Sequence, residues 1–490
     1  MKIYIENHTD YLNDYYFKSL CLLYFHSEKF PVEDSSPNTA RFILKKEDKG
    51  LTAFCEISSP YGKASAECKE EDIVFTIPTP GEEIAKSITG KALLAAGYKL
   101  FGFIPPWGHI TGLRPVKRAR FYLERGFSEK KVRRLFENDH NVSREKTDLS
   151  IDTAYNEIKL LSDLENNNCG VYVSIPFCPT RCDYCSFVSY SNQKLFKLIP
   201  DYLARLLKDI KKTGEIIRET GFVPSAIYIG GGTPSFLSEE QLEFLLSGIN
   251  KHIPMENLRE FSFEAGRPDT LTKEKLNIIN KYGVNRISVN PQTTNQTVLD
   301  AIGRKHTVED FFQAAKLVKK YDFKTVNADI IAGLPKDTFE SFSKTLDDVL
   351  SLGFENVTVH TLSIKNAAEM KNEEGIFDPA GSLARECVSY VGKTLKAKNY
   401  RPYYLYRQKR TVGNGENTGY SLEGHECLYN VMMMEETSSV FACGAGAITK
   451  LVSSDGEHIE RIAFPKFPFE YLEKEEGIGE ERIKSFFAKG

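Results

Sequence analysis

The clearest pattern in the chain lies between residues 169 and 397, where short apolar runs alternate with longer amphipathic stretches. Six runs rich in β-branched and aromatic residues are typical of strands: 171–175, 225–229, 260–264, 285–289, 326–331 and 356–360. The stretches between them have helical spacing: 194–219, 239–252, 272–282 and 307–321. This alternation predicts parallel strands joined by right-handed crossovers. The predicted fold class is α/β, a full or partial βα barrel with its chemistry at the C-terminal ends of the strands.

The segments on either side of this region have different patterns. Residues 1–150 are predicted as an N-terminal α/β extension, followed by a helical linker to about residue 168, where a polar stretch interrupts the pattern. Its strand-like runs are 1–7, 40–46, 51–57 and 63–71, and its helical patterns are 82–98 and 128–165. Residues 169–397 form the barrel core. Residues 398–490 are less regular and are predicted as a C-terminal accessory region ending in a charged helix.

Composition and charge exclude several classes of function for this protein. At 490 residues the chain has room for about three domains. Its 64 basic and 67 acidic side chains give a net charge of −3, so the chain as a whole does not attract nucleic acid or an anionic membrane. No apolar run is long enough to span a bilayer, and the first residues lack the segments of a signal peptide. We expect a cytoplasmic protein without a membrane span or a nucleic-acid partner.

Three of the ten cysteines lie close together, directly after the first strand of the predicted barrel: Cys178, Cys182 and Cys185. A structural zinc site needs four ligands, usually in two separated pairs. Three thiolates instead suit a [4Fe–4S] cluster with one iron left open for a small ligand. The alternative is a zinc clip completed by a remote cysteine. The other seven cysteines are scattered, and we expect them to be small core residues.

Two further features follow predicted strands. Gly230, Gly231 and Gly232 precede Thr233 after the second strand, where consecutive glycines allow a ligand to approach the backbone or simply form a tight turn. Glu264 ends the third strand, where a carboxylate can accept hydrogen bonds from ribose hydroxyls or lie at the edge of the core.

Several charged residues are harder to interpret. Asp329 lies in an otherwise apolar strand, where an unpaired charge is costly, so we expect a partner and Arg304 is the candidate. Such a pair can be purely structural. His306 is expected to be hydrogen-bonded or exposed, as most single histidines are. The basic residues of the segment 114–120 are interpreted as a solvated helix face.

Six ordered motifs carry a resemblance to a known family. Between Tyr172 and Pro335 the chain contains YVSIPFCPTRCDYC, IYIGGGTPS, FEAGRPD, RISVNPQ, AIGRKHT and NADIIAGLP. These are similar to the motifs of radical S-adenosylmethionine (SAM) enzymes, and in particular of oxygen-independent coproporphyrinogen III oxidases. The segments WGHITGLRP and YYLYRQK resemble the longer coproporphyrinogen dehydrogenase subgroup, which has an N-terminal extension.

This resemblance implies a partial (β/α)6-type barrel with a [4Fe–4S] cluster on the three cysteines. It implies that the SAM bound to the cluster contacts Gly231 of the glycine loop and also Tyr172, Glu264 and Ile448. A second SAM molecule is also implied, so the expected cofactors are the cluster and one or two molecules of SAM. The residues implied to line the second site are Tyr184, Gly232, Thr233, Gln292, Arg304, Asp329 and Ser363. No catalytic side chain is identified.

The implied reaction converts propionate side chains of coproporphyrinogen III to vinyl groups, giving protoporphyrinogen IX, by way of a 5′-deoxyadenosyl radical. The expected partners are the porphyrinogen and a one-electron donor such as a flavodoxin or ferredoxin. The substrate carboxylates require cationic anchors, for which the segment 114–120 and Arg407, Lys409 and Arg410 are candidates.

One position departs from the family pattern. The best-known oxidases have a fourth cysteine two residues after the third, where this chain has Phe187. A close branch with the same replacement includes proteins thought to deliver heme. A heme-trafficking protein is therefore the alternative, as is another radical SAM enzyme acting on a tetrapyrrole.

Overall fold

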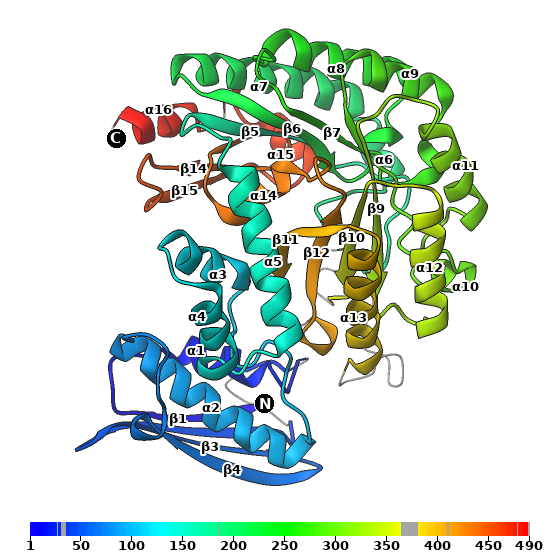
Figure 1. Cartoon of the computed structure of the whole chain (residues 1–490). Helices are drawn as coiled ribbons and strands as arrows, with labels where there is room; N and C mark the ends of the chain where they lie inside the picture. Colours follow the sequence, from blue (N-terminus) through cyan, green and yellow to red (C-terminus); the bar gives the residue numbers. More distant parts are fainter. Residues whose placement is uncertain are drawn as a thin grey trace. The chain divides into compact units, whose positions relative to one another are not determined.

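The chain forms two compact units, which are described separately (Figure 1). The computed structural model describes residues 1–26, 28–30, 36–185, 187–363, 381–408, 411–477 and 479–488. The first unit comprises Met1–Ile158, Asp378–Arg385 and Leu405–Glu416. The second unit comprises Lys159–Phe377, Glu386–Tyr404 and Asn417–Gly490.

The first unit contains a four-stranded sheet in the order β1-β2-β3-β4. Its strands are β1 (Lys2–Asn7), β2 (Thr39–Glu47), β3 (Gly50–Ser59) and β4 (Gly62–Lys69). Helix α2 (Gly81–Phe101) packs against one face, and α1 (Asp14–Cys21) follows β1 (Figure 1). Phe42 of β2 and Ile57 of β3 are buried with Ile88 and Leu93 of α2, because alternate strand residues point to the helix. The strands and the helix predicted from the sequence are confirmed.

A smaller core in the same unit surrounds Trp107, the only tryptophan. It is built by α3 (Pro115–Glu124), α4 (Glu129–Arg134), a π-helical turn (Leu135–Asp139) and α5 (Arg144–Leu161), which ends in the second unit. The Trp107 indole donates to Glu416 at 2.8 Å, and Lys146 Nζ donates to the same carboxylate at 2.7 Å. The fold tolerates the buried ion pair of Lys146 and Glu416 only because both charged groups are hydrogen-bonded. Arg120 is also buried here, so the expectation that the whole basic stretch is solvated was wrong for this residue.

The second unit is built on an eleven-stranded sheet in the order β11-β12-β10-β9-β8-β7-β6-β5-β13-β14-β15. The last residues of β11 and the first residue of β12 belong to the first unit. Seven neighbouring strands are parallel: β10 (Asn356–Thr361), β9 (Thr325–Ala332), β8 (Arg286–Ser288), β7 (Glu260–Glu264), β6 (Val223–Gly231), β5 (Asn168–Ile175) and β13 (Val440–Cys443). The flanking strands are β11 (Arg401–Arg407), β12 (Glu416–Ser421), β14 (Ile448–Val452) and β15 (Ile459–Ala463). The sequential order of β5 to β10 confirms the predicted partial barrel.

Helices line the outer face of this curved sheet (Figure 1). Those between the parallel strands are α6 (Gln193–Phe196), α7 (Ile199–Glu219), α8 (Glu239–His252), α9 (Lys273–Lys281), α10 (Gln296–Ala301), α11 (Val308–Val318) and α12 (Phe339–Ser351). The later helices are α13 (Ser382–Ala397), α14 (Leu428–Glu435), α15 (Pro468–Glu473) and α16 (Glu480–Ala488). Local signals set their starts: Ser238 and Gln241 form a capping box at α8. Pro200 lies in the first turn of α7, which separates that helix from α6 within the stretch predicted as one helix.

Several elements of the second unit were not predicted: the helices α13, α14 and α15 and the strands β11, β12, β14 and β15 were not assigned, and neither were three others. The short strand β13 lies in the region that has no regular pattern, and α10 and α12 were not assigned. No helix among the described residues is long and apolar enough to cross a membrane.

Candidate functional site

The three clustered cysteines lie in a loop that follows β5 in the second unit. The loop is closed at its base, because the Cys178 N–H donates to Tyr190 O at 3.0 Å and the Tyr190 N–H donates to Pro176 O at 2.8 Å. A tight turn links the other two cysteines, with the Cys185 N–H donating to Cys182 O at 3.0 Å. Cys182 is buried, and the other two are half-buried. Burial raises the pKa of Cys178 to about 11, and coordination to a metal is what removes the proton from such a thiol.

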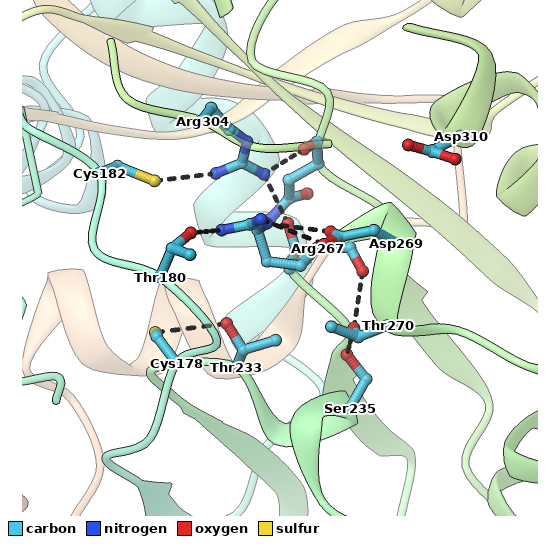
Figure 2. A network of polar contacts seen from close by, with 12 residues as sticks. Cys178, Thr180, Cys182, Thr233, Ser235, Arg267, Asp269, Thr270, Arg304 and Asp310 are labelled. Carbon is cyan, nitrogen blue, oxygen red and sulfur yellow. Dashed lines mark hydrogen bonds and ion pairs between the residues drawn. The ribbon is translucent and has the colours of Figure 1, made fainter. Parts of the chain in front are cut away.

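The glycine loop after β6 packs directly against the cysteine loop. The Gly232 N–H donates to Ile175 O, and the Thr233 hydroxyl donates to Cys178 Sγ at 3.3 Å (Figure 2). A Cβ at Gly232 would lie 2.9 Å from that sulfur and 2.6 Å from Phe177 O, so no larger residue fits. The glycine run is therefore required by the close approach of two backbone segments beside the cysteines.

Arg304 organises the opposite side of the cysteine loop. Its guanidinium lies 3.7 Å from Cys182 Sγ (Figure 2). It donates to Tyr184 Oη at 3.2 Å. It also donates to the carbonyls of Gly266 at 2.7 Å and Asn290 at 2.6 Å, which follow β7 and β8. A buried positive charge at this place favours anionic sulfur on the loop. The expected pairing of this arginine with an aspartate was wrong.

Asp329 of β9 has other partners. Its carboxylate accepts from Asn327 Nδ2 at 2.9 Å and lies 3.6 Å from His360 Nε2. Burial alone would raise the pKa of Asp329, but the hydrogen bonds from His360 and neighbouring side chains hold it below its ordinary value. Asn327 lies on β9 and His360 on β10, so residues of the same strand and of its neighbour satisfy the charge of Asp329.

Gln292 lies beside Asp329 in an unusual backbone conformation. Its N–H donates to Asp329 O and its carbonyl accepts from the Ile331 N–H, while its φ of 66° is in the left-handed region. A glutamine rarely adopts this conformation, which marks a locally constrained position. Gln292 is buried, and its Oε1 has no hydrogen-bond partner among the described residues. This amide oxygen is an acceptor that a bound ligand can satisfy.

Glu264 and a group of tyrosines form the adjoining wall of the barrel. Burial first, and then the charge of Asp329, raise the pKa of Glu264 to about 8. Tyr172 of β5 stacks on Tyr228 of β6 and on Tyr429 of α14, with ring centroids 6.3 and 6.0 Å apart. The Tyr228 and Tyr429 rings are 4.8 Å apart. The three rings thus pack on one another beside the Glu264 carboxyl group.

Arg267 is a residue of the site that the sequence analysis missed. It is buried, forms two contacts of 3.1 Å with the Asp269 carboxylate, and donates to Thr180 Oγ1 in the cysteine loop at 2.7 Å (Figure 2). A signal was present, since the motif FEAGRPD places an arginine between a glycine and a proline directly after a strand. Tyr228 and Tyr429 were also missed, and no local pattern distinguishes them from core tyrosines.

The remaining candidates lie apart from this network or have other roles. Ser363 follows the end of β10, and Ile448 is the first residue of β14 and is half exposed. Arg407 is buried in the first unit, where it donates to Ile110 O at 2.5 Å and lies over the Trp107 ring. Lys409 and Arg410 lie outside the described residues.

The donor set around the cysteine loop fits an iron–sulfur cluster. Three thiols share one loop, Gly232 leaves room beside Cys178, and two buried arginines, Arg267 and Arg304, support the loop. No group of three or more His, Cys, Asp or Glu among the described residues could hold a metal ion. A cluster binds each thiolate at a separate iron, so its ligands need not converge on one point.

Comparisons with known proteins agree with this arrangement. The sequence profile of the Radical SAM superfamily matches residues 172–349. An oxygen-independent coproporphyrinogen-III oxidase-like protein of Bacillus subtilis is 38% identical over 390 residues, which cover 78% of this chain and 77% of the relative. A heme chaperone of the same organism is 31% identical over 330 residues, covering 64% of this chain and 81% of that protein.

Among solved structures, coproporphyrinogen III oxidase from Escherichia coli, described as a radical SAM enzyme, has a TM-score of 0.51 at 20% identity. The superposition covers 67% of this chain and 73% of that chain, which shows a shared fold. The family implies a [4Fe–4S] cluster and SAM as cofactors. The cysteine loop, the partial barrel and these relatives agree, and the chain belongs to the radical SAM family of oxygen-independent coproporphyrinogen III oxidases and related proteins.

Proposed function

We propose that this protein is an oxygen-independent coproporphyrinogen III oxidase, which converts propionate side chains to vinyl groups and so forms protoporphyrinogen IX. The observation that carries the proposal is the extent of the match to the oxidase-like relative. The match covers 78% of this chain, which is a larger share than the residues after 168 make up. The matched region therefore includes part of the N-terminal region as well as the barrel. The match to the heme chaperone covers a smaller share of this chain, 64%.

In this proposal Cys178, Cys182 and Cys185 hold the cluster, and Tyr172, Gly231, Glu264 and Ile448 contact its SAM. When bound, these cofactors supply one-electron chemistry that generates an organic radical able to abstract hydrogen from an unactivated carbon. The chain itself orients the ligands and excludes water. Arg304 keeps the cysteine loop in place against the loops after β7 and β8.

A second SAM molecule is also part of the proposal. Its contacts are Tyr184, Gly232, Thr233, Gln292, Arg304, Asp329 and Ser363. Support comes from Gln292, whose buried Oε1 has no partner among the described residues and whose backbone N–H donates to Asp329 O. Hydrogen-bond donors of the bound SAM would satisfy Gln292 Oε1 and remove the free-energy cost of leaving this buried acceptor without a partner.

The heme-chaperone function is the second candidate, and one residue favours it. Phe187, at the position of the fourth cysteine in the best-known oxidases, is 70% exposed. A large exposed apolar side chain next to the cysteine loop offers a contact to an apolar ring. Chaperones of this family from several bacteria, including Bacillus subtilis and Escherichia coli, match more than half of this chain.

The test is product analysis under strict exclusion of oxygen. The reconstituted protein is incubated with SAM, dithionite and coproporphyrinogen III. The products are then separated and their masses are measured by mass spectrometry. We expect loss of two carboxyl groups and formation of methionine and 5′-deoxyadenosine, and no product from the variant Cys182→Ala. Heme is titrated in parallel. Stable stoichiometric heme binding without decarboxylation would replace the oxidase proposal with the chaperone function, and a methylated or cleaved tetrapyrrole would replace both.

The proposed partners follow from the chemistry. Cluster reduction requires a one-electron donor, for which a flavodoxin or a ferredoxin is the proposed class. None of the ten cysteines forms a disulfide, which fits a reducing compartment, and we propose the cytoplasm.

A further inference from the structure

Two sulfurs of the cysteine loop accept hydrogen bonds from other loops of the second unit. Thr233, in the glycine loop after β6, donates from its hydroxyl to Cys178 Sγ at 3.3 Å (Figure 2). Arg304, in the loop after α10, donates from Nη1 to Cys182 Sγ at 3.7 Å (Figure 2). The fold brings these donors to the sulfurs, because they lie 55 and 122 positions away in the sequence.

The third sulfur has its donors within the cysteine loop itself. Cys185 Sγ accepts a hydrogen bond from the Phe187 N–H. The hydroxyl of Ser189, which is buried, forms a hydrogen bond with Cys178 or with Cys185. Burial raises the pKa of these two thiols, and the hydrogen bond from Ser189 opposes that rise because it stabilises the thiolate. Each of the three sulfurs therefore has at least one hydrogen-bond donor.

Arg304 carries a buried positive charge that no carboxylate of the described residues balances. Its guanidinium contacts the Tyr184 hydroxyl, two backbone carbonyls and the Cys182 sulfur. Arg267, the other buried arginine beside the loop, is paired with Asp269. A buried cation without a counter-charge is costly, so an anionic Cys182 sulfur is the group that balances the charge of Arg304.

Hydrogen bonds and positive charge at the ligand sulfurs affect the redox state of an iron–sulfur cluster. Reduction adds one negative charge, part of which lies on the cysteine sulfurs. A donor that binds anionic sulfur therefore stabilises the reduced state more than the oxidised state, and it raises the reduction potential. The effect is larger for a charged donor in a buried site, where the dielectric constant is low.

We propose that Thr233, Ser189 and Arg304 raise the reduction potential of a [4Fe–4S] cluster on the three cysteines. They act as positioning residues through hydrogen bonds to the ligand sulfurs, and they allow a weaker one-electron donor to reduce the cluster. The proposal rests on the proposed assignment of the cluster to these cysteines. It does not depend on whether the protein is an oxidase or a heme chaperone.

Potentiometric titration of the reconstituted full-length protein tests the proposal, with electron paramagnetic resonance to measure the reduced cluster. The titration is made without SAM, so that altered SAM binding does not contribute. Thr233→Val keeps the shape of the side chain and removes the hydroxyl. We expect the equilibrium constant for reduction to fall about tenfold, which is about 59 mV for one electron. Thr233→Ser keeps the hydroxyl and should retain the potential of the wild type.

Two further variants test the other donors. Ser189→Ala removes a hydroxyl that does not come from the glycine loop, and it should also lower the reduction potential. Arg304→Gln removes a full positive charge beside Cys182, so the lowering should be larger than in Thr233→Val.

Thr213→Val is the matched control. The Thr213 hydroxyl lies 3.1 Å from Cys443 Sγ, a buried contact of the same kind between α7 and β13 that lies outside the cysteine loop. The variant should therefore keep the reduction potential of the wild type. An equal lowering in Thr213→Val and Thr233→Val would show that the potential responds to loosened packing and not to donors at the cluster sulfurs.

Iron and sulfide contents separate the remaining outcomes. A wild-type protein that binds neither would show that the cysteines hold no cluster, and this proposal would fall with that assignment. If wild type and Thr233→Val hold equal amounts of cluster at the same potential, only the tuning by hydrogen bonds is refuted. If Arg304→Gln loses the cluster, the variants of Thr233 and Ser189 decide the result. Loss of the cluster from all three would overturn the proposal, because the donors would then be needed for assembly.

Discussion

Arg304 illustrates what a single buried residue does in this site. Its guanidinium joins three loops at once, with contacts to Tyr184 of the cysteine loop and to the carbonyls of Gly266 and Asn290. Sequence reasoning identified it as a site residue through the family motif but assigned it the wrong partner. The reason is that Asp329 is satisfied within its own sheet, by Asn327 and His360.

Glu264 leads to a prediction about the pH dependence of SAM binding. Its pKa of about 8 means that the carboxyl group is largely protonated at neutral pH in the ligand-free protein. The ionised carboxylate accepts hydrogen bonds from ribose hydroxyls more strongly than the protonated acid does, so SAM affinity should rise about tenfold from about pH 6.5 to about pH 8 and then level off. Calorimetric titration of SAM at several pH values measures this.

The variant Glu264→Gln should bind SAM more weakly and without this pH dependence. Glu256→Gln, which changes an exposed glutamate, serves as the control. A wild-type affinity that stays flat or falls over this interval would contradict the assigned role.

His306 leads to a prediction about stability. It is 1% exposed and has no hydrogen-bond partner among the described residues, contrary to the expectation from its sequence. Burial, and then the charges of Arg304 and Arg267, lower its pKa to about 2. The unfolded chain therefore binds a proton below about pH 6.5 that the folded chain does not, so the free energy of unfolding falls as pH falls.

The His306 contribution to this loss should be about 1.5 kcal/mol between about pH 6.5 and pH 5. Urea unfolding of the wild type and of His306→Leu at both pH values measures it, and the variant should lose less stability on acidification. His8→Leu replaces an exposed histidine and should behave like the wild type. Equal pH slopes for wild type and His306→Leu would refute the buried neutral imidazole.

At the scale of elements, periodicity predicted the helices and strands where it was regular and failed where an element was too short to show it. The strands β5 to β10 all coincide with apolar runs, whereas β13 has four residues and lies among glycine-rich loops.

The start of α14 depends on a residue of another element. Glu260, the first residue of β7, is buried and accepts from the N–H groups of Leu428 at 2.6 Å and Tyr429 at 3.3 Å.

Replacing this glutamate should destabilise the second unit. Glu260→Gln keeps the shape but removes the negative charge that interacts with the N-terminus of α14, so we expect a loss of about 1 kcal/mol. Urea unfolding followed by circular dichroism measures the change. Glu256→Gln, just outside the same strand and exposed, should have no effect; an equal loss in both variants would show that the helix contact does not stabilise the fold.

At the scale of the whole molecule, the sheet of the second unit depends on residues far apart in the chain. β13 pairs with β5 in parallel, from Val440 opposite Gly170 to Cys443 opposite Val173. The Tyr202 hydroxyl connects the two segments, since it donates to Ser174 O at 2.8 Å and accepts from the Ala445 N–H at 2.9 Å. The residues after 435 therefore complete the structure that positions the cysteine loop.

A chain that ends after residue 435 should expose the β5 edge and aggregate, because unpaired backbone groups at a buried sheet edge recruit other strands. Soluble yield and analytical ultracentrifugation measure this outcome. A chain that ends after residue 477 removes α16 but keeps β13 to β15, and it should remain soluble. A monomeric, folded product from the shorter chain would show that the added strands are dispensable.

The sequence by itself determined what depends on neighbouring residues: the spacing of Cys178, Cys182 and Cys185, the glycine run beside them, and the strand–helix alternation that specifies a barrel. Only the tertiary structure decided which side chains meet across long separations. Arg304 reaches a cysteine 122 positions away, and Glu260 caps a helix 168 positions away. Such pairings depend on how the elements pack, and packing leaves no periodic signal in the sequence around either partner.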